Sequence, residues 1–98
     1  MSICVVVQGR IENREKLDEY VAKVKPLIQS GGGRILGFDE SPEVVEGKIE
    51  NPRTVILEFP SRDAFRAWYD SDDYQAILPL RLESTPGTMI LVKGFPPE

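Results

Sequence analysis

The side chains with the clearest chemical potential are concentrated between Thr54 and Arg81. A carboxylate can act as a general base or acid, a guanidinium can hold the carboxylate of a ligand, and a phenol can donate a hydrogen bond. Glu58 lies near the end of an apolar run that Phe59 closes, and Tyr74 and Arg81 follow in a stretch with helical spacing. Glu58 and Tyr74 are therefore candidate catalytic residues, and Arg81 is a candidate ligand-binding residue.

Structural roles compete with each of these assignments. Glu58 can instead form an ion pair with Arg81 or Arg34, and Arg81 can cap the carbonyls at the end of its helix. Tyr69 and Tyr74 can line a pocket mouth or pack in the core with a hydrogen-bonded tip, and the core is the expected place for Trp68. Further candidate ligand-binding residues are Tyr69, Gln8 and Asp39.

The sequence excludes several kinds of chemistry. It contains no histidine, which rules out Ser-His-Asp and Cys-His catalysis, haem held by histidine, and most zinc sites. Asp70, Asp72 and Asp73 lack the glycine and glutamate of a calcium loop. The run Gly31–Gly33 follows a helical pattern and lacks GK[ST], so it predicts a helix end rather than a phosphate cradle. We expect neither a metal nor a cofactor.

Composition narrows the class of protein. The net charge of −4, with no cluster of lysine or arginine, argues against nucleic-acid binding. No apolar run approaches the roughly 20 residues of a membrane span. The start, MSICVVVQGR, lacks the basic region of a signal peptide, and the single Cys4 cannot form an internal disulfide. We expect one cytoplasmic domain over residues 1–98.

The pattern of apolar residues predicts an α+β fold. Strands are expected at 3–9, 34–40, 54–59 and 88–92, with an arm or strand extension at 43–47. Asn13, Ser61 and Ser71 are expected N-caps, and Pro79 is expected to bend or end the last helix. The order predicts a ferredoxin-like βαββαβ fold, in which helices cover one face of a four-stranded antiparallel sheet.

Strand parity predicts a partner for the other face. Val55, Leu57 and Phe59 should face the helices, which directs Ile56 and Glu58 to the opposite side. By the same rule, Cys4, Val6 and Gln8 lie on that side in the first strand. An apolar sheet face is unusual in a monomer, so we expect a homodimer that packs these faces together. The alternative is a monomer whose loop 43–53 covers the face.

The segment EFPSRDAFRAWYDSDDYQAILPLR, preceded by GGGRILG and followed by TMILVKG, resembles the small bacterial family of unknown function numbered 1330. That family belongs to the dimeric α+β barrel superfamily. The resemblance implies a ferredoxin-like fold and a dimer of face-packed sheets, and it implies no established activity. Members often carry a histidine where this chain has Gly31, so a histidine-dependent role does not transfer. The superfamily also includes cofactor-independent monooxygenases, muconolactone isomerases and haem-binding proteins.

Three functional hypotheses follow. The first is a dimeric protein that binds a small molecule in a pocket between the sheet and the helices. The second is a cofactor-independent enzyme, similar to an isomerase or a monooxygenase, that acts on a small and partly apolar acid. In it Glu58 would be the base or acid, Arg81 would hold the substrate carboxylate, and Tyr74 would donate a hydrogen bond. The third is an interaction module that acts through the dimer surface alone.

Overall fold

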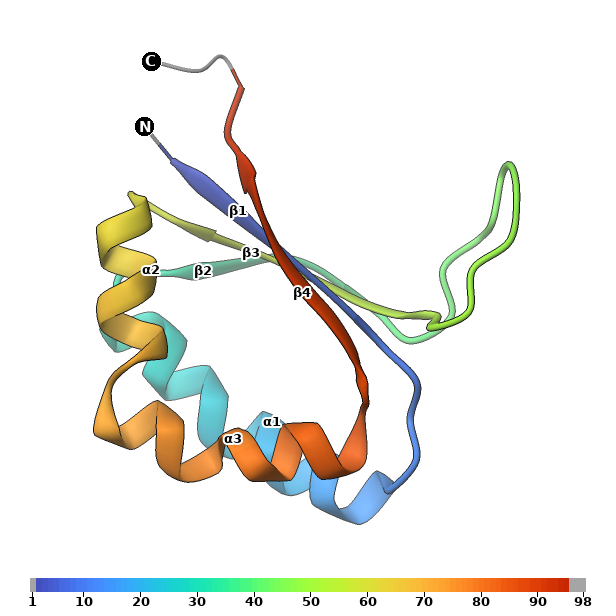
Figure 1. The fold of residues 1–98 in the computed structure, drawn as a ribbon, viewed down its shortest axis with the longest axis horizontal. Helices are drawn as coiled ribbons and strands as arrows, with labels where there is room; N and C mark the ends of the chain where they lie inside the picture. The colour runs from blue at the N-terminus through green and yellow to red at the C-terminus, as the bar shows by residue number, and fades with distance from the viewer. Residues whose placement is uncertain (1, 96–98) are drawn as a thin grey trace.

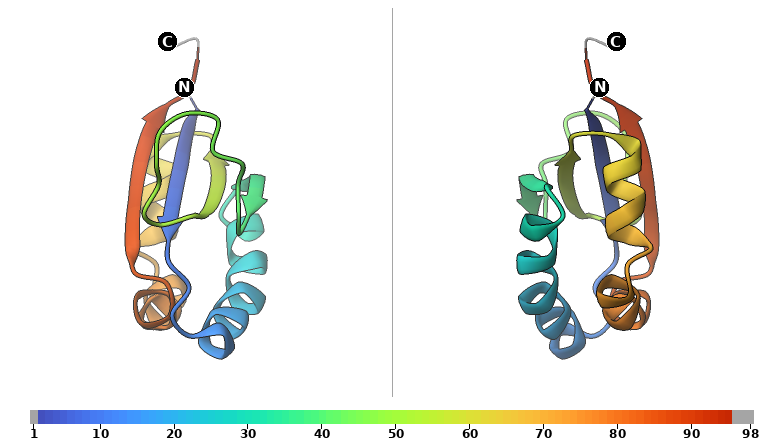
Figure 2. Two further views of the ribbon diagram at one scale, coloured as in Figure 1. Left: turned by 90° about the vertical axis from the view of Figure 1, so that its right-hand side faces the viewer. Right: turned by 90° about the vertical axis from the view of Figure 1, so that its left-hand side faces the viewer.

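The fold is one antiparallel sheet with all helices on one of its faces (Figures 1 and 2). A computed structural model describes residues 2–95. The sheet has the order β2-β3-β1-β4, and each neighbouring pair is antiparallel. The predicted four-stranded sheet is confirmed. In chain order, the elements are β1 (Ile3–Gly9), α1 (Arg14–Ser30), β2 (Arg34–Asp39), β3 (Arg53–Phe59), α2 (Arg62–Tyr69), α3 (Asp72–Ser84) and β4 (Gly87–Lys93).

The three predicted N-caps are present. The side chain of Asn13 accepts a hydrogen bond from the Lys16 amide at 3.0 Å at the start of α1. The hydroxyl oxygens of Ser61 and Ser71 accept in the same way at the starts of α2 and α3, at 3.0 and 3.1 Å. Each cap satisfies an amide that has no partner within its helix. These contacts explain why the chain breaks into two helices after β3.

Pro79 was expected to bend or end the last helix, and the expectation that it ends the helix is wrong. Helix α3 runs through Pro79 to Ser84. A proline removes the hydrogen bond to the carbonyl four residues earlier, which here belongs to Gln75. Both Gln75 and Pro79 are exposed, so water can satisfy that carbonyl. Pro26 is accommodated within α1 on an exposed face in the same manner.

The long connection between β2 and β3 is irregular. Residues 40–52 contain no strand, so the predicted strand extension over 43–47 is wrong. Gly47 adopts a positive φ of 83°, which interrupts any extended run. The loop projects to the side of the sheet opposite the helices (Figures 1 and 2).

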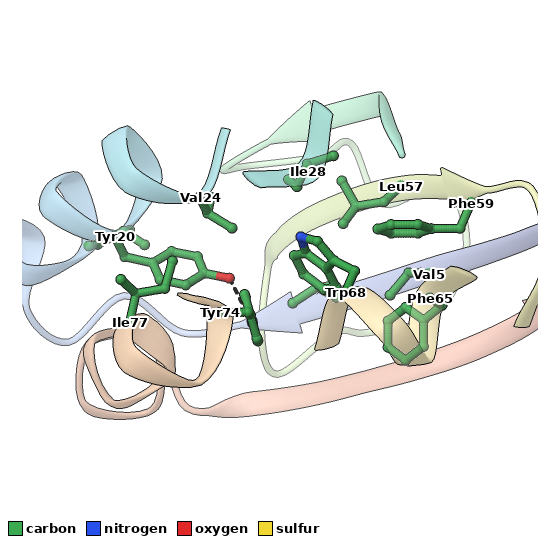
Figure 3. Close-up of a cluster of buried hydrophobic side chains, with 12 residues drawn as sticks. Val5, Tyr20, Val24, Ile28, Leu57, Phe59, Phe65, Trp68, Tyr74 and Ile77 are labelled. Atoms are coloured by element: carbon green, nitrogen blue, oxygen red, sulfur yellow. Dashed lines mark hydrogen bonds between the residues drawn. The ribbon is translucent and has the colours of Figure 1, made fainter. Parts of the chain in front are cut away.

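The core lies between the sheet and the helices. Burial alternates along the whole of β1, and Val5 is buried. In β3, Leu57 and Phe59 are buried as parity predicts, and Val55 is partly buried against the core. Trp68 packs between α2 and the sheet, with its ring centroid 5.2 Å from that of Phe59 and 4.1 Å from that of Tyr74 (Figure 3).

The opposite face of the sheet is open and largely apolar. Ile56 of β3 pairs with Val6 of β1, which in turn pairs with Ile90 of β4. Ile90 is 54% exposed and Val92 is 43% exposed in the single chain. At the outer edge of β2, a bulge shifts the register between Ile35 and Gly37, so Leu36 has no partner in the register.

Candidate functional site

A cavity of about 40 Å³ lies in the helix-facing half of the molecule. Helix α1, the strands and Trp68 form its walls, and most of the wall is apolar. Lys25 and two side chains of edge strand β2, Ile35 and Phe38, are exposed, so they mark its mouth. The complete lining is Val7, Tyr20, Val21, Val24, Lys25, Ile28, Ile35, Phe38, Arg53, Val55, Leu57, Trp68, Arg81 and Met89.

Arg53 is a buried cation at the start of β3. The residue is only 4% exposed, and its Nε has no hydrogen-bond partner among the described residues. Its guanidinium lies over the Phe38 ring, 5.0 Å from the centroid, which supplies a cation–π contact. Burial lowers the pKa of Arg53 below its ordinary value. Arginine nevertheless remains charged at neutral pH, so the cavity contains an internal positive charge.

The nearest carboxylate to Arg53 already has another partner. Arg53 Nε and Glu40 Oε2 are 3.9 Å apart, which is beyond hydrogen-bonding distance. Arg14 donates two hydrogen bonds to the Glu40 carboxylate, at 2.8 and 3.0 Å, and these contacts hold the pKa of Glu40 below its ordinary value. Glu40 therefore compensates Arg53 only in part.

Trp68 presents a second unpaired donor to the cavity. The residue is 5% exposed, and its Nε1 has no hydrogen-bond partner among residues 2–95. Figure 3 shows the indole nitrogen on the side of the ring turned toward Ile28 and Leu57, which also line the cavity. A buried indole N–H usually has an acceptor. The predicted core packing of Trp68 is confirmed, and the same residue also forms part of the cavity wall.

A hydrogen-bonded chain closes another side of the cavity. The hydroxyl oxygens of Tyr20 and Tyr74 are 2.9 Å apart, and Arg81 Nε donates to the Tyr74 hydroxyl at 3.3 Å. Burial raises the pKa of Tyr20, and the neighbouring Tyr74 raises it further. Tyr20 and Arg81 reach the cavity, whereas Tyr74 lies behind them. The helix end is capped by Ser84 and Thr85, whose hydroxyls donate to the Arg81 carbonyl, so the Arg81 side chain is not needed there.

The structure separates the predicted catalytic residues. Tyr74 and Arg81 are in contact below the sheet, but Glu58 belongs to the open face, where Arg34 Nε donates to its Oε1 at 2.7 Å. The sheet therefore lies between Glu58 and Arg81. The expected arrangement in which Glu58, Arg81 and Tyr74 act on one substrate is wrong, because β3 alternates its side chains between the two faces. The predicted pairing of Glu58 with Arg34 is present.

The other predicted ligand-binding residues lie outside the cavity. On the open face, Gln8 Nε2 donates to Thr54 Oγ1 at 3.3 Å. Asp39 pairs with Thr54 in the register, and its carboxylate accepts from the Ser41 amide at 2.9 Å. The Tyr69 ring stacks on Phe65 at 5.6 Å. The Tyr69 ring also lies 5.3 Å from that of Tyr74. The structure thus brings Tyr74, Arg81 and Tyr69 together and leaves Gln8 and Asp39 on the other face of the sheet.

Sequence reasoning missed Arg53, which it placed in a polar loop. The signal was available, because Arg53 shares the parity of Val55, Leu57 and Phe59 and therefore faces the helices. Tyr20 lies on the buried, apolar face of α1 together with Leu17 and Val24. Its hydroxyl becomes a site group because α1 lies next to α3, which supplies Tyr74.

Two classes of feature are absent from the described part of the chain. Within residues 2–95, no group of three or more Cys, Asp or Glu side chains is arranged to hold a metal ion. Among the helices described, none combines the length and the apolar character that crossing a bilayer requires.

Comparison with known families identifies the chain. Residues 3–95 match the model of the domain of unknown function DUF1330, so the chain belongs to that family and the predicted resemblance is confirmed. No protein with a curated description matches the sequence.

Solved structures share the fold. A protein of unknown function from Rhodopseudomonas palustris is 18% identical with a TM-score of 0.77, over 98% of this chain and 84% of that one. A dimeric ferredoxin-like protein of unknown function from Jannaschia sp. CCS1 is 17% identical with a TM-score of 0.71, over 96% and 100%. A Nitrosomonas europaea protein, provisionally named an antibiotic biosynthesis monooxygenase, is 13% identical with a TM-score of 0.64, over 97% and 99%. These likenesses establish the ferredoxin-like fold.

Proposed function

We propose that the protein is a homodimer that binds a small molecule in the cavity between its helices and its sheet. The observation that carries this proposal is the pair of unpaired buried donors, Arg53 Nε and Trp68 Nε1, in the wall of one cavity. A buried polar group without a partner costs about 1–3 kcal/mol. A bound molecule that accepts hydrogen bonds from these groups removes that cost.

The dimer part of the proposal is supported by the open face of the sheet. Val6, Ile56 and Ile90 form a row across β1, β3 and β4, and the helices are all on the other side. A second sheet packed face to face would bury this row, as twofold dimers commonly do. Two proteins with this fold, from Thermobifida fusca and Jannaschia sp. CCS1, are described as dimeric. The single free thiol, Cys4, suits a reducing compartment, and we place the protein in the cytoplasm.

Binding without turnover is favoured over an enzyme. The described lining of the cavity contains no carboxylate and no histidine, so it offers no ordinary general base. Glu58 is on the opposite face of the sheet and cannot serve there. The remaining titratable hydroxyl, that of Tyr20, has a raised pKa, which keeps it protonated and suits a hydrogen-bond donor.

Native mass spectrometry of freshly purified protein tests both parts of the proposal. We expect two subunits and a retained small molecule that is released on denaturation. Val55→Phe, which places a larger side chain in the cavity, should lose the retained molecule and keep the dimer. Leu82→Phe, on the exposed side of α3, is the matched control and should retain both. A monomer, or a retained molecule that is unaffected by Val55→Phe, would contradict the proposal.

A further inference from the structure

Resting on the proposed function, we infer that the ligand is a short organic monocarboxylate that the cavity holds by its negative charge. The inference starts from the charged groups at the cavity. Arg53, Arg81 and Lys25 all line it, and no carboxylate does. The lining is therefore strongly positive in a chain whose net charge is −4. A local reversal of sign at a concave site attracts anions.

The hydrogen-bonding groups that line the cavity also favour an anionic ligand. Arginine, lysine and the indole of tryptophan donate hydrogen bonds and accept none. Four of the five polar side chains that line the cavity are of these kinds, and the fifth is Tyr20, whose hydroxyl can also donate. A carboxylate only accepts hydrogen bonds and is therefore complementary to this set. An amide or alcohol would place its own donor against groups that cannot accept it.

Burial makes the incomplete pairing of these cations energetically unfavourable. Arg53 and Arg81 are 4% and 7% exposed, and Glu40 is too far from Arg53 to form a hydrogen bond. A buried charge without a close counterion is unfavourable, and water can solvate such a charge without neutralising it. Arg53 Nε and Trp68 Nε1 are both unpaired, so a ligand carboxylate has two donors available on arrival.

Size and shape restrict the rest of the ligand. A cavity of about 40 Å³ holds roughly three water molecules, which corresponds to a carboxylate with a short chain. The remaining wall is formed by aliphatic side chains such as Val24, Val55 and Met89. Phosphate or sulfate would present charged oxygens to this apolar surface, whereas an alkyl chain would fill it. The exposed mouth between Lys25 and Phe38 provides the route of entry.

The test compares acids with neutral molecules of the same shape. Propionate and butyrate are titrated against propionamide, butyramide and inorganic phosphate, with calorimetry and intrinsic fluorescence as readouts. Trp68 is the only tryptophan in the sequence, so its emission reports directly on the cavity. We expect the acids to bind at least about tenfold more tightly than the amides, since a charge-assisted hydrogen bond is lost with the charge.

Variants of Arg53 test whether this residue binds the carboxylate of the ligand. Arg53→Met should abolish acid binding, Arg53→Lys should retain part of it, and the exposed Arg62→Met should bind as the parent does. Without ligand, Arg53→Met should unfold at the same temperature as the parent or higher, because it removes an incompletely paired buried charge. A purely structural role for Arg53 would instead lower the midpoint. If Arg53→Met fails to fold, the comparison of acid with amide on the parent protein still decides the matter.

The outcomes separate the inference from the proposed function. Amides or phosphate that bind as tightly as the acids overturn the carboxylate assignment, as does full acid binding by folded Arg53→Met. If no acid binds while a neutral molecule is retained by the parent and lost from Val55→Phe, the proposed function stands and the carboxylate assignment fails. If no probe binds and nothing is retained, both fail.

Discussion

The hydroxyl oxygens of Tyr20 and Tyr74 lie 2.9 Å apart inside the core, where they link the first and last helices. Arg81 donates to the same Tyr74 hydroxyl, so one phenol connects a buried cation to α1. Two phenols and a guanidinium at this depth are all hydrogen-bonded, and removing one member affects the others.

Tyr20→Phe tests whether the buried Tyr20 hydroxyl makes the stability of the protein depend on pH. Because its folded-state pKa is raised above the unfolded value of 10.0, the unfolded chain loses this proton first as pH rises. The stabilisation is therefore complete below pH 10 and is lost progressively above it. From about pH 10 to about pH 11, the unfolding free energy of the parent should fall by about 1 kcal/mol more than that of Tyr20→Phe. Chemical denaturation at each pH measures this difference, and parallel curves would contradict it.

Trp68→Ala should destabilise the protein by roughly 3–5 kcal/mol, as large-to-small core substitutions do. The reason is the loss of packing against Phe59, Phe65 and Tyr74, whose ring centroids lie 4.1–5.9 Å away. Urea denaturation measures the change, with the exposed Leu82→Ala as the control. A midpoint nearly equal to that of the parent would show that Trp68 serves the cavity more than the core.

Ile56→Asp should convert the proposed dimer into a monomer or an aggregate. Ile56 occupies the middle of the open face, between Val6 and Gly37 in the register, and a carboxylate there would be buried without a partner. Sedimentation velocity measures the subunit number at micromolar concentration. A well-folded monomer of the parent protein under the same conditions rules the dimer out.

Glu58→Gln distinguishes an interface ion pair from a surface one. In a single subunit, the side chains of Glu58 and Arg34 are 25% and 71% exposed, and such a pair contributes less than about 1 kcal/mol. A partner sheet would shield the pair, and loss of one member would leave Arg34 buried without its counterion. We expect the dimer dissociation constant to rise by about tenfold while the fold is retained. An unchanged dissociation constant places the pair outside the interface.

Local rules were sufficient to predict most of the fold. Ser61 and Ser71 revealed two helix starts because a cap acts on amides three residues away. The alternation of Val55 and Leu57 with Ile56 identified the two faces of the central strand. Pro79 misled the prediction because its effect depends on whether water reaches the Gln75 carbonyl, which is a property of the whole fold.

The site was harder to predict because it depends on contacts between distant elements. Glu58 lies just before α2 in the sequence and Arg81 lies in α3, yet the sheet separates their side chains. The residues before Arg53 are polar, which suggested that Arg53 belongs to the loop. Strand parity alone would have indicated that its side chain faces the helices. The unpaired state of Arg53 also depends on Arg14, which holds Glu40 from the other side. Arg14 and Arg53 thus compete for the carboxylate of Glu40, and no pattern in a single stretch of sequence shows such competition.

The bulge at Leu36 has a consequence for how copies of this chain can assemble. Strand β2 is at the outer edge of the sheet, and a regular edge is a template on which further strands can add without limit. The shifted register between Ile35 and Gly37 interrupts the spacing of backbone groups that an incoming strand would need. Growth by strand addition at this edge is thereby discouraged. The proposed association through the open face, in contrast, would be complete after two copies, so the bulge favours a finite particle over a fibre.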